Sequence, residues 1–272
     1  MRWFNRILCV LVGLYLAAML FVYISQRNFM YFPDTSQPPA DLAAQGISLV
    51  KLAPNGVDGK LTALYSPPSS PDAPIILFFH GNGGAMHQRR PQFRDFQNWG
   101  AGFLAVEYPG YGGNPGTPNE KNILATALAG YDWLRTLNYK PEQIIVFGHS
   151  LGTASATYVA AHRQTAGLVL TSPFISTKAM ARLSMPYFPT GILLKDTFRS
   201  DLWMANVKEP LLIIHGNADE DVPYGMGTSL LAKHKGSHEF VTIQGGHHYL
   251  WNTASPKHIR KFVFEHVSVA SP

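Results

Sequence analysis

The sequence contains a single cysteine, Cys9, among its 272 residues. That thiol lies in the first apolar segment, so a disulfide framework, a CxxC pair and thiol catalysis are all excluded. Charged side chains are scarce as well. They make up 14% of the residues, whereas an average soluble domain has about 25%. This deficit predicts a weakly charged surface of the kind that suits a position beside lipid.

Basic residues are not concentrated in any part of the chain. The net charge is +5, but Arg89-Arg90 and Arg260-Lys261 are the only adjacent pairs of basic side chains. Nucleic-acid binding needs a basic stripe or patch, so we expect no nucleic-acid partner. A mild attraction to anionic lipid head groups fits the charge at least as well. No set of Asp, Cys and His residues has the spacing of metal ligands, and we expect neither a metal ion nor an organic cofactor.

Residues Ile7–Ile24 form an apolar run without a charge or a proline. At about 1.5 Å per residue this run makes a helix of roughly 27 Å, just long enough to cross a bilayer core. A buried core helix would show a polar face, which this run lacks. A secretory signal peptide would have a shorter apolar region and a small-x-small cleavage site, whereas this run ends in the bulky residues FVYI. We therefore predict that residues 1–26 form an uncleaved transmembrane signal anchor.

The charges around this run predict its orientation. Arg2 and Arg6 precede it, and Arg27 alone follows it closely. The positive-inside rule then places the N-terminus in the cytoplasm. The rest of the chain is expected on the far side of the membrane, in a periplasmic or a lumenal/extracellular space. The aromatic residues just beyond the run (FMYF) resemble an interfacial belt.

After a juxtamembrane linker at residues 27–45, strand-like and helix-like segments alternate through one domain at residues 46–272. Such alternation predicts a mostly parallel sheet with helices on both faces. The first two strands flank the Asn55-Gly56 turn and are expected to pair antiparallel. The expected strands are Ile47–Leu52, Leu61–Tyr65, Ile75–Phe79, Phe103–Tyr108, Ile144–Phe147, Leu168–Thr171, Pro210–Ile214 and Phe240–Ile243. The expected helices are Arg90–Trp99, Glu120–Leu137, Leu151–Ala161, Gly225–Lys235 and Pro256–Val267.

Residues 172–209 interrupt the alternation, because they contain several prolines and no candidate strand. A structureless loop of that length is uncommon in a compact domain, so a small helical cap over the substrate pocket is predicted. Its apolar side chains would line an apolar, adaptable pocket, or they would simply pack the cap onto the domain. These residues are Phe174, Ile175, Met180, Leu183, Met185, Tyr187, Phe188, Ile192 and Leu193.

The strongest chemical signal is the G-x-S-x-G sequence around Ser150 (GHSLG). It follows an apolar strand and precedes a helix of small residues, which is the context that this motif requires. Gly148 and Gly152 permit a sharp strand-to-helix turn, which holds the serine above the sheet at the N-terminus of a helix. An ordinary glycine-rich turn would not need that context. We predict that Ser150 is a nucleophile.

A serine nucleophile needs a base and an acid. The base is expected after the last strand, where His247 and His248 follow a glycine pair; we favour His247, which directly follows the glycines. The acid is expected after the preceding strand, where Asp219 and Asp221 are candidates; we favour Asp219, although either aspartate could simply cap the loop. The chain order Ser, Asp, His is the order that α/β-hydrolases use.

The oxyanion of a tetrahedral intermediate needs two backbone donors. One is expected to be the N–H of Leu151, next to the nucleophile. The other is expected in the glycine-rich loop HGNGG, and we assign it to the N–H of Asn82. His80 and His215, which both end strands ahead of a glycine, are more simply explained as residues that shape these loops.

Six segments together resemble the α/β-hydrolase superfamily: FFHGNGG, VEYPGYGGNPGTP, VFGHSLG, LTSPF, IIHGNADEDVP and GGHHYLW. More narrowly, they resemble its membrane-anchored α/β-hydrolase-domain branch, which is related to serine peptidase-like hydrolases and depalmitoylases. The resemblance extends from Arg27 to nearly the end of the chain and implies Asp219 as acid and His247 as base. In that branch Asn-Asp usually follows the histidine, whereas His248-Tyr249 follow here. Glu107 stands where the branch commonly has Asp.

These features lead to one expected function and two alternatives. We expect a serine hydrolase that cleaves carboxylic esters or thioesters of a small-molecule or lipid-like acyl substrate through an acyl-enzyme on Ser150. A peptidase or amidase would use the same residues. A catalytically silent α/β-hydrolase that only binds would not need the complete set.

Overall fold

The computed structural model describes residues 1–267, apart from the side chains of His248 and Tyr249. Its main sheet has eight strands in the order β10-β9-β8-β7-β4-β6-β3-β2. β3 runs antiparallel to both neighbours, and the other neighbouring strands are parallel. The strands are β2 (Ser48–Leu52), β3 (Leu61–Ser66), β4 (Ile75–Phe79), β6 (Gly102–Val106), β7 (Ile144–His149), β8 (Gly167–Thr171), β9 (Leu211–Gly216) and β10 (His238–Ile243).

The central strands are buried on both faces, as their unbroken apolar runs predict. In β4, Ile75, Leu77 and Phe79 belong to one hydrophobic core, and Ile76 and Phe78 belong to the other. Helices α3, α4 and α8 contribute to the first core, and α2 and α9 contribute to the second. The predicted α/β architecture is therefore confirmed. These helices are α2 (Arg90–Asn98), α3 (Glu120–Thr136), α4 (Gly152–His162), α8 (Tyr224–Leu231) and α9 (Ser255–His266).

Most predicted elements occur with small shifts at their ends. The antiparallel pairing of the first two strands is confirmed by the register of Val50 with Ala63. Asn119 caps α3, because its side chain accepts a hydrogen bond from the N–H of Asn122 at 2.9 Å. The helix predicted at Gly225–Lys235 is too long at its C-terminal end, because α8 ends at Leu231. The residues after α8 form tighter i to i−3 hydrogen bonds that end the helix.

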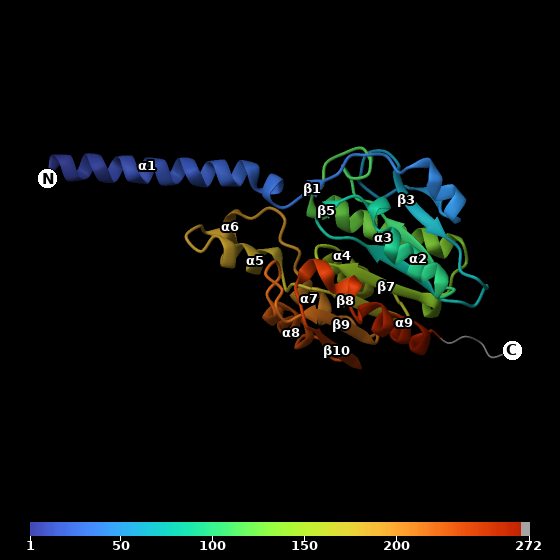
Figure 1. Ribbon diagram of the computed structural model, residues 1–272. Coiled ribbons are helices and arrows are strands. Elements are labelled where there is room, and N and C mark those ends of the chain that lie inside the picture. The colour runs from blue at the N-terminus through green and yellow to red at the C-terminus, as the bar shows by residue number, and fades with distance from the viewer. Residues whose placement is uncertain (268–272) are drawn as a thin grey trace.

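Residues 172–209 contain three short helices, α5 (Thr177–Ser184), α6 (Thr190–Leu193) and α7 (Ser200–Met204). The first two form the cap and lie beside α1 (Arg2–Ser25), away from the sheet (Figure 1). The third packs on α4, where the ring of Trp203 lies 4.9 Å from that of Tyr158. Only the first part of the predicted cap segment therefore stands over the pocket.

The segment between α1 and the sheet is packed against the rest of the molecule. It contains the 3₁₀ helices η1 (Gln26–Phe29) and η2 (Ala40–Gln45) and the short strand β1 (Phe32–Pro33), which pairs with β5 (Gly83–Gly84). Tyr31 and Leu42 are buried. The segment predicted as a juxtamembrane linker thus contributes side chains to the domain's two cores.

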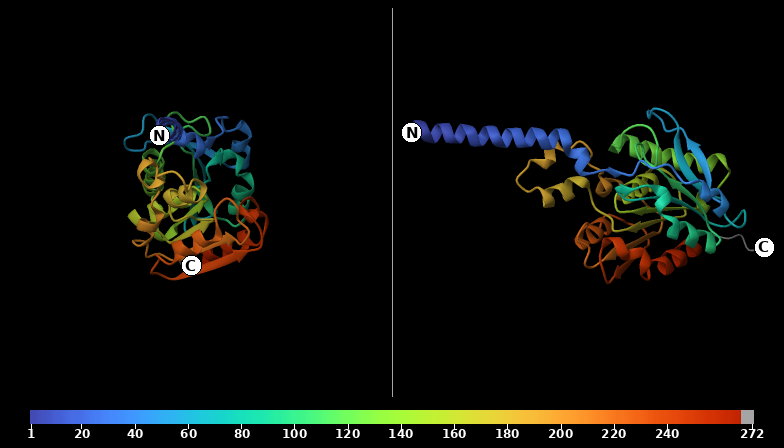
Figure 2. Two further views of the ribbon diagram at one scale, coloured as in Figure 1. Left: turned by 90° about the vertical axis from the view of Figure 1, so that its left-hand side faces the viewer. Right: turned by 45° about the horizontal axis from the view of Figure 1, so that its top comes forward.

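Helix α1 projects from the domain, and its N-terminus lies far from the sheet (Figures 1 and 2). It is the one helix in the described chain that is long and apolar enough to cross a membrane, by length and composition. No residue of α1 is buried.

Candidate active site

Ser150 lies in a sharp turn between the end of β7 and the start of α4. Its φ is +50°, in the left-handed region that side-chain-bearing residues rarely adopt. The turn is tight because the flanking glycines lack a Cβ. A Cβ on Gly152 would collide with the carbonyl oxygen of Phe79, and one on Gly148 would collide with the Gly152 backbone. The sequence therefore forms the strained turn that the motif predicts, and the serine lies at the carboxyl edge of the sheet.

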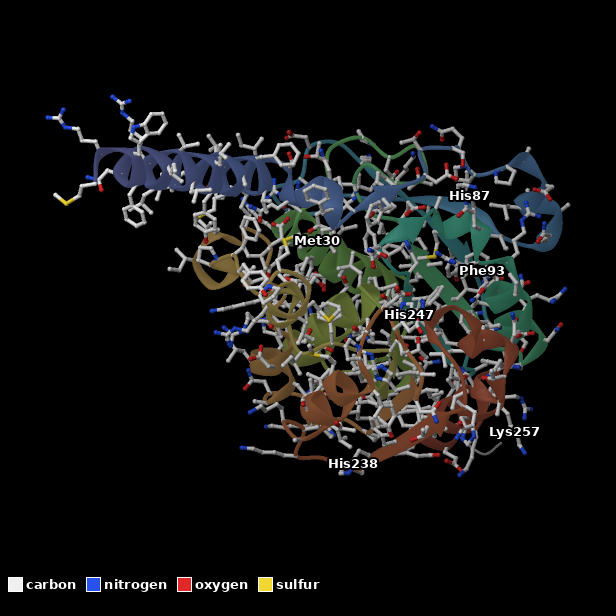
Figure 3. All side chains as sticks on the ribbon, turned by 60° about the vertical axis from the view of Figure 1, so that its left-hand side comes forward. Met30, His87, Phe93, His238, His247 and Lys257 are labelled. Carbon is white, nitrogen blue, oxygen red and sulfur yellow. The ribbon has the colours of Figure 1, made fainter. Side chains whose placement is uncertain are left out.

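His247 and Asp219 lie together beyond the carboxyl ends of the adjacent strands β10 and β9. Nδ1 of His247 lies 2.9 Å from Oδ2 of Asp219, and both residues are buried. Figure 3 shows His247 in the interior of the domain, between the C-terminal elements and the rest of the sheet. The side chain of His248 lies outside the described residues, so the choice between the two histidines stays a prediction.

The Asp219 carboxylate accepts several further hydrogen bonds. The hydroxyl of Ser172 donates to Oδ2 at 2.7 Å, and the N–H groups of Val222 and Asp221 donate to Oδ1 at 2.7 and 3.1 Å. Burial by itself raises the pKa of Asp219. Hydrogen bonds from His215, His247, Val222 and Ser172 outweigh burial and hold the pKa well below its usual range. Asp219 is therefore an anion, suited to orient an imidazole and to stabilise its charged form.

His215 supports the same loop and makes no contribution to the cavity wall. Its Nε2 donates to the carbonyl oxygen of Val222 at 2.9 Å and lies 3.5 Å from Oδ2 of Asp219. The side chain is fully buried. The interpretation of His215 as a loop-shaping residue agrees with this geometry.

The two predicted oxyanion donors come from different loops, one directly after Ser150 and one after β4. Leu151 directly precedes α4, where backbone N–H groups have no acceptor inside the helix. Two hydrogen bonds fix the backbone of Asn82. Its backbone carbonyl oxygen accepts from the N–H of Phe32 at 2.9 Å and from the hydroxyl of Tyr111 at 2.8 Å. Both Asn82 and Leu151 line the same cavity as Ser150.

Glu107 organises the loop that carries Asn82. Its Oε1 lies 2.8 Å from Nε2 of the fully buried His80, and its Oε2 accepts from the N–H of Met86 at 2.6 Å. The hydroxyl of Tyr108 donates to the His80 carbonyl at 2.9 Å. Glu107 directly follows β6 and thus contacts both ends of the loop at residues 80–86.

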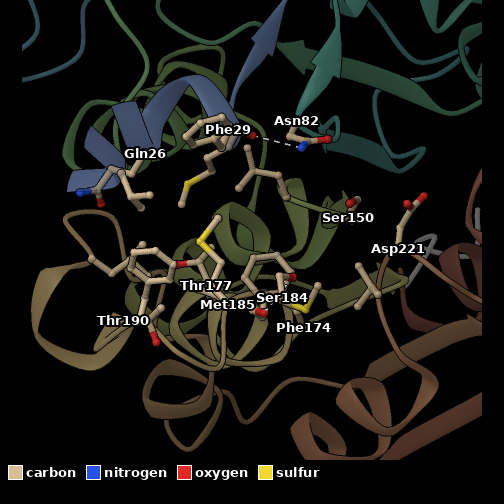
Figure 4. Close-up of a pocket in the computed structure, with 18 of the residues that line it drawn as sticks. Gln26, Phe29, Asn82, Ser150, Phe174, Thr177, Ser184, Met185, Thr190 and Asp221 are labelled. Carbon is tan, nitrogen blue, oxygen red and sulfur yellow. Dashed lines mark hydrogen bonds between the residues drawn. The ribbon is translucent and has the colours of Figure 1, made fainter. Parts of the chain in front are cut away.

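A cavity of about 480 Å³ extends from the nucleophile toward the cap and α1. Ser150 and Asp221 lie toward one end of it, and Gln26 and Thr190 lie toward the other (Figure 4). Its volume falls in the range of small-molecule sites, roughly 300–1,000 Å³. The apolar side chains in the wall include Val22, Phe29, Met30, Leu151, Phe174, Met180, Met185, Phe188, Leu193 and Leu194.

Of the two roles predicted for the apolar cap residues, pocket lining and packing onto the domain, both occur, since Ile175 packs against the first core, and three residues have neither role. Phe174, Met180, Met185, Phe188 and Leu193 line the cavity, whereas Leu183, Tyr187 and Ile192 point outward and are exposed. Sequence reasoning did not anticipate that the end of α1 would form part of the wall. Nor did it find Ser172, although this residue directly follows β8 at the sheet edge where the other site residues lie.

Comparison with known proteins agrees with this architecture. Residues 74–202 match the family model described as alpha/beta hydrolase fold. An uncharacterized protein of Mycobacterium tuberculosis is 33% identical over 233 residues, which cover 84% of this chain and 82% of that protein. The human alpha/beta hydrolase domain-containing protein 17B is 30% identical over 187 residues, 66% of this chain and 62% of that protein.

Solved structures show the same fold at low sequence identity. An esterase of Pyrococcus furiosus superposes with a TM-score of 0.69 at 18% identity, over 88% of this chain and 98% of the esterase. The sheet order, the strained turn at Ser150 and these similarities lead to one conclusion. The chain belongs to the α/β-hydrolase superfamily.

Proposed function

We propose that this protein is a serine hydrolase that cleaves carboxylic esters or thioesters through an acyl-enzyme on Ser150. The observation that carries the proposal is that His247, hydrogen-bonded to the anionic Asp219, lines the same cavity as Ser150, which lies in a strained strand-to-helix turn. A serine hydroxyl becomes a useful nucleophile only when a positioned base accepts its proton.

In the acylation step, Ser150 Oγ attacks the substrate carbonyl carbon while His247 takes the hydroxyl proton. Asp219 stabilises the resulting imidazolium. The N–H groups of Leu151 and Asn82 donate to the oxyanion, and each such donor contributes about 3 kcal/mol to transition-state stabilisation. The tetrahedral intermediate then loses the alcohol or thiol, which receives its proton from His247.

Deacylation repeats these steps with water. His247 takes a proton from the water, whose oxygen attacks the acyl carbon and forms a second oxyanion in the same donor site. Breakdown of this intermediate releases the carboxylic acid and returns the proton to Ser150. Every proton transfer uses His247, and no metal ion or organic cofactor takes part.

The acyl group is expected to be apolar. The cavity wall beyond Ser150 is formed mainly by aliphatic, aromatic and methionine side chains, which adapt to a flexible chain. Each methylene of a substrate that this wall covers adds up to about 0.8 kcal/mol of binding.

We further propose that α1 anchors the protein in a membrane with its N-terminus in the cytoplasm. The length of its apolar run supports the anchor, and Arg2 and Arg6, which precede that run, support this orientation.

Labelling with a fluorophosphonate probe tests the mechanism. The full chain should react covalently at Ser150, and Ser150→Ala should lose both labelling and ester turnover while retaining its circular dichroism spectrum. Labelling of Ser150→Ala at the wild-type rate would remove Ser150 as the nucleophile. A panel of ester, thioester and amide substrates with one acyl chain then measures the leaving-group preference.

A further inference from the structure

One face of α1 lies against the cap. The Tyr15 hydroxyl donates to the carbonyl oxygen of Tyr187 at 2.9 Å, and its ring stacks on Phe188 with the ring centroids 6.1 Å apart. Val22 lines the cavity and Gln26 is buried. Residues 15, 22 and 26 share one face of a helix. Figures 1 and 2 show the cap along the C-terminal part of α1.

The contact reaches far along the helix. Tyr15 precedes Ser25, the last residue of α1, by ten residues, so it lies about 15 Å from that end of the helix. A bilayer hydrocarbon core is about 30 Å thick. When the apolar run of α1 crosses a bilayer, a loop that touches Tyr15 lies at hydrocarbon depth and not in the water outside.

The part of the cap that reaches Tyr15 has the composition that such a position requires. We call residues 183–193 the cap tip. It contains no charged residue, and the exposed fractions of Leu183, Tyr187 and Ile192 are 59%, 86% and 87%. A water-facing loop rarely exposes so many large apolar side chains together. A segment that inserts into a membrane does expose them, because lipid covers these side chains.

Basic residues border the cap tip on both sides in the sequence. Arg182 precedes it and Lys195 follows it closely. The Lys195 ammonium lies 4.1 Å from the ring centroid of Tyr23, which is near the end of α1. In both the cap and α1, therefore, apolar residues lie at hydrocarbon depth and cations lie at the depth of the lipid head groups.

The cavity that Ser150 lines extends to these same two elements. Val22 and Tyr23 of α1 form part of its wall on one side, and Met185, Phe188 and Leu193 of the cap tip form part of its wall on the other. An acyl chain that moves from the leaflet toward Ser150 along this route contacts mainly apolar side chains.

We propose that the cap tip inserts into the leaflet beside the catalytic domain, and that the space between it and α1 admits the acyl chain of a lipid ester directly from that leaflet. The inference rests on the proposed hydrolysis at Ser150 for its chemistry. Insertion of the cap tip is a separate physical claim and is measured separately.

Depth-dependent fluorescence quenching measures insertion. In the full chain carrying Cys9→Ser, the substitution Tyr187→Cys provides one labelling site for a bimane fluorophore, and Leu137→Cys provides a matched exposed site on the domain. In phosphatidylcholine vesicles, nitroxides on the acyl chains should quench the label at position 187 several-fold more than the label at position 137. Equal quenching at the two positions would overturn the proposal.

Rates of ester hydrolysis test whether the acyl chain enters the cavity from the leaflet. The double variant Tyr187→Asp, Ile192→Asp should hydrolyse a long-chain fluorogenic ester in vesicles at least roughly tenfold more slowly than wild type, because two carboxylates oppose insertion. Its turnover of a water-soluble short-chain ester should remain unchanged, as should both activities of Leu202→Asp, an exposed control on α7.

An unchanged vesicle rate in the double variant, or an equal loss on both esters, would overturn the inference. If wild type hydrolyses neither ester, the proposed function fails, and the quenching experiment still decides whether the cap tip inserts.

Discussion

Asp219 is the residue at which most hydrogen bonds of the candidate site converge. It accepts from His247, from Ser172 and from the N–H groups of the following loop. Asp221, only two residues later, lines the cavity instead. Two carboxylates of one loop thus have different surroundings, and among the described contacts it is Asp219 that pairs with His247 in the geometry of a residue that orients the base.

We predict that Asp219→Asn lowers kcat for an activated ester by about four orders of magnitude, since a neutral amide favours the wrong imidazole tautomer and cannot stabilise an imidazolium. Asp221→Asn keeps the volume of its side chain and leaves His247 paired, so its loss should be far smaller. Steady-state kinetics on both folded variants make the comparison. A larger loss at Asp221 would transfer the role of the acid to that residue.

Ser172 is predicted to be a positioning residue. Its φ of +49° and complete burial direct its hydroxyl to Asp219 at 2.7 Å. A hydrogen bond to a charged group contributes about 1.5–3 kcal/mol, so Ser172→Ala should lower kcat roughly 10- to 100-fold with little change in KM. Ser200→Ala is the matched control, because this buried hydroxyl has no hydrogen-bond partner among the described residues. Equal effects of both substitutions would indicate general destabilisation.

The sequence predicted those site residues that local motifs mark. The strand–glycine–serine context identified Ser150, and loop positions after the last two strands identified Asp219 and His247; their roles stay predictions. Ser172 and Glu107 could not be assigned in this way. Their partners are 47 and 27 residues away in the chain, and no local pattern states which loop a buried hydroxyl or carboxylate will reach.

At the scale of elements, burial on both faces makes the central strands easy to predict, because every position must be apolar. The structure of the segment between α1 and the sheet was harder to predict from the sequence. Its structure depends on contacts with the cap, more than 160 residues later. Arg27 donates to Asp196 through two nitrogens at 2.8 and 3.1 Å, and Tyr31 donates to the same carboxylate at 3.0 Å. Such pairs leave no signal in either segment alone.

We predict that Arg27→Ala loosens the cap. Asp196 is 3% exposed, so removal of its cationic partner leaves a buried carboxylate with one neutral donor and destabilises this contact by about 1–3 kcal/mol. Limited proteolysis within residues 183–193 should accelerate, and KM for long-chain esters should rise. Arg163→Ala breaks an equally bidentate but exposed pair with Asp132 and should change neither. Identical digestion of Arg27→Ala and wild type would contradict the prediction.

At the scale of the whole molecule, the depressed pKa of Asp219 couples the site to stability. Its folded pKa lies below the ordinary value of 3.8, so folding favours the ionised form. This contribution is complete above the unfolded pKa and is lost as pH falls from about 4 toward the folded pKa. The denaturation midpoint of wild type in detergent should therefore drop more steeply below about pH 4 than that of Asp219→Asn. If the denaturation midpoints of wild type and Asp219→Asn fall equally steeply below about pH 4, this coupling is contradicted.

Helix α1 and the domain are expected to have separate roles, which truncated chains can test. The full chain should stay with membranes through high-salt and carbonate washes, because salt screens charges but not the burial of an apolar helix. A chain that begins at Gln26 loses α1, and with it Val22 and Tyr23 from the cavity wall. It keeps Arg27, the β1–β5 pairing and the three proposed catalytic residues, so it should be soluble and should hydrolyse short esters near the full-chain rate.

A chain that begins at Gln37 is the sharper comparison, since it also loses β1 and both partners of Asp196. The N–H of Phe32 then no longer holds the carbonyl of Asn82, and a buried carboxylate is left without its donors. This chain should unfold at a lower temperature than the chain from Gln26 and should show a lower kcat on the same short ester. Thermal denaturation and kinetics on the two chains make the test. Equal melting temperatures and equal kcat would mean that residues 26–36 are a passive tether, and that the domain shapes its oxyanion loop without them.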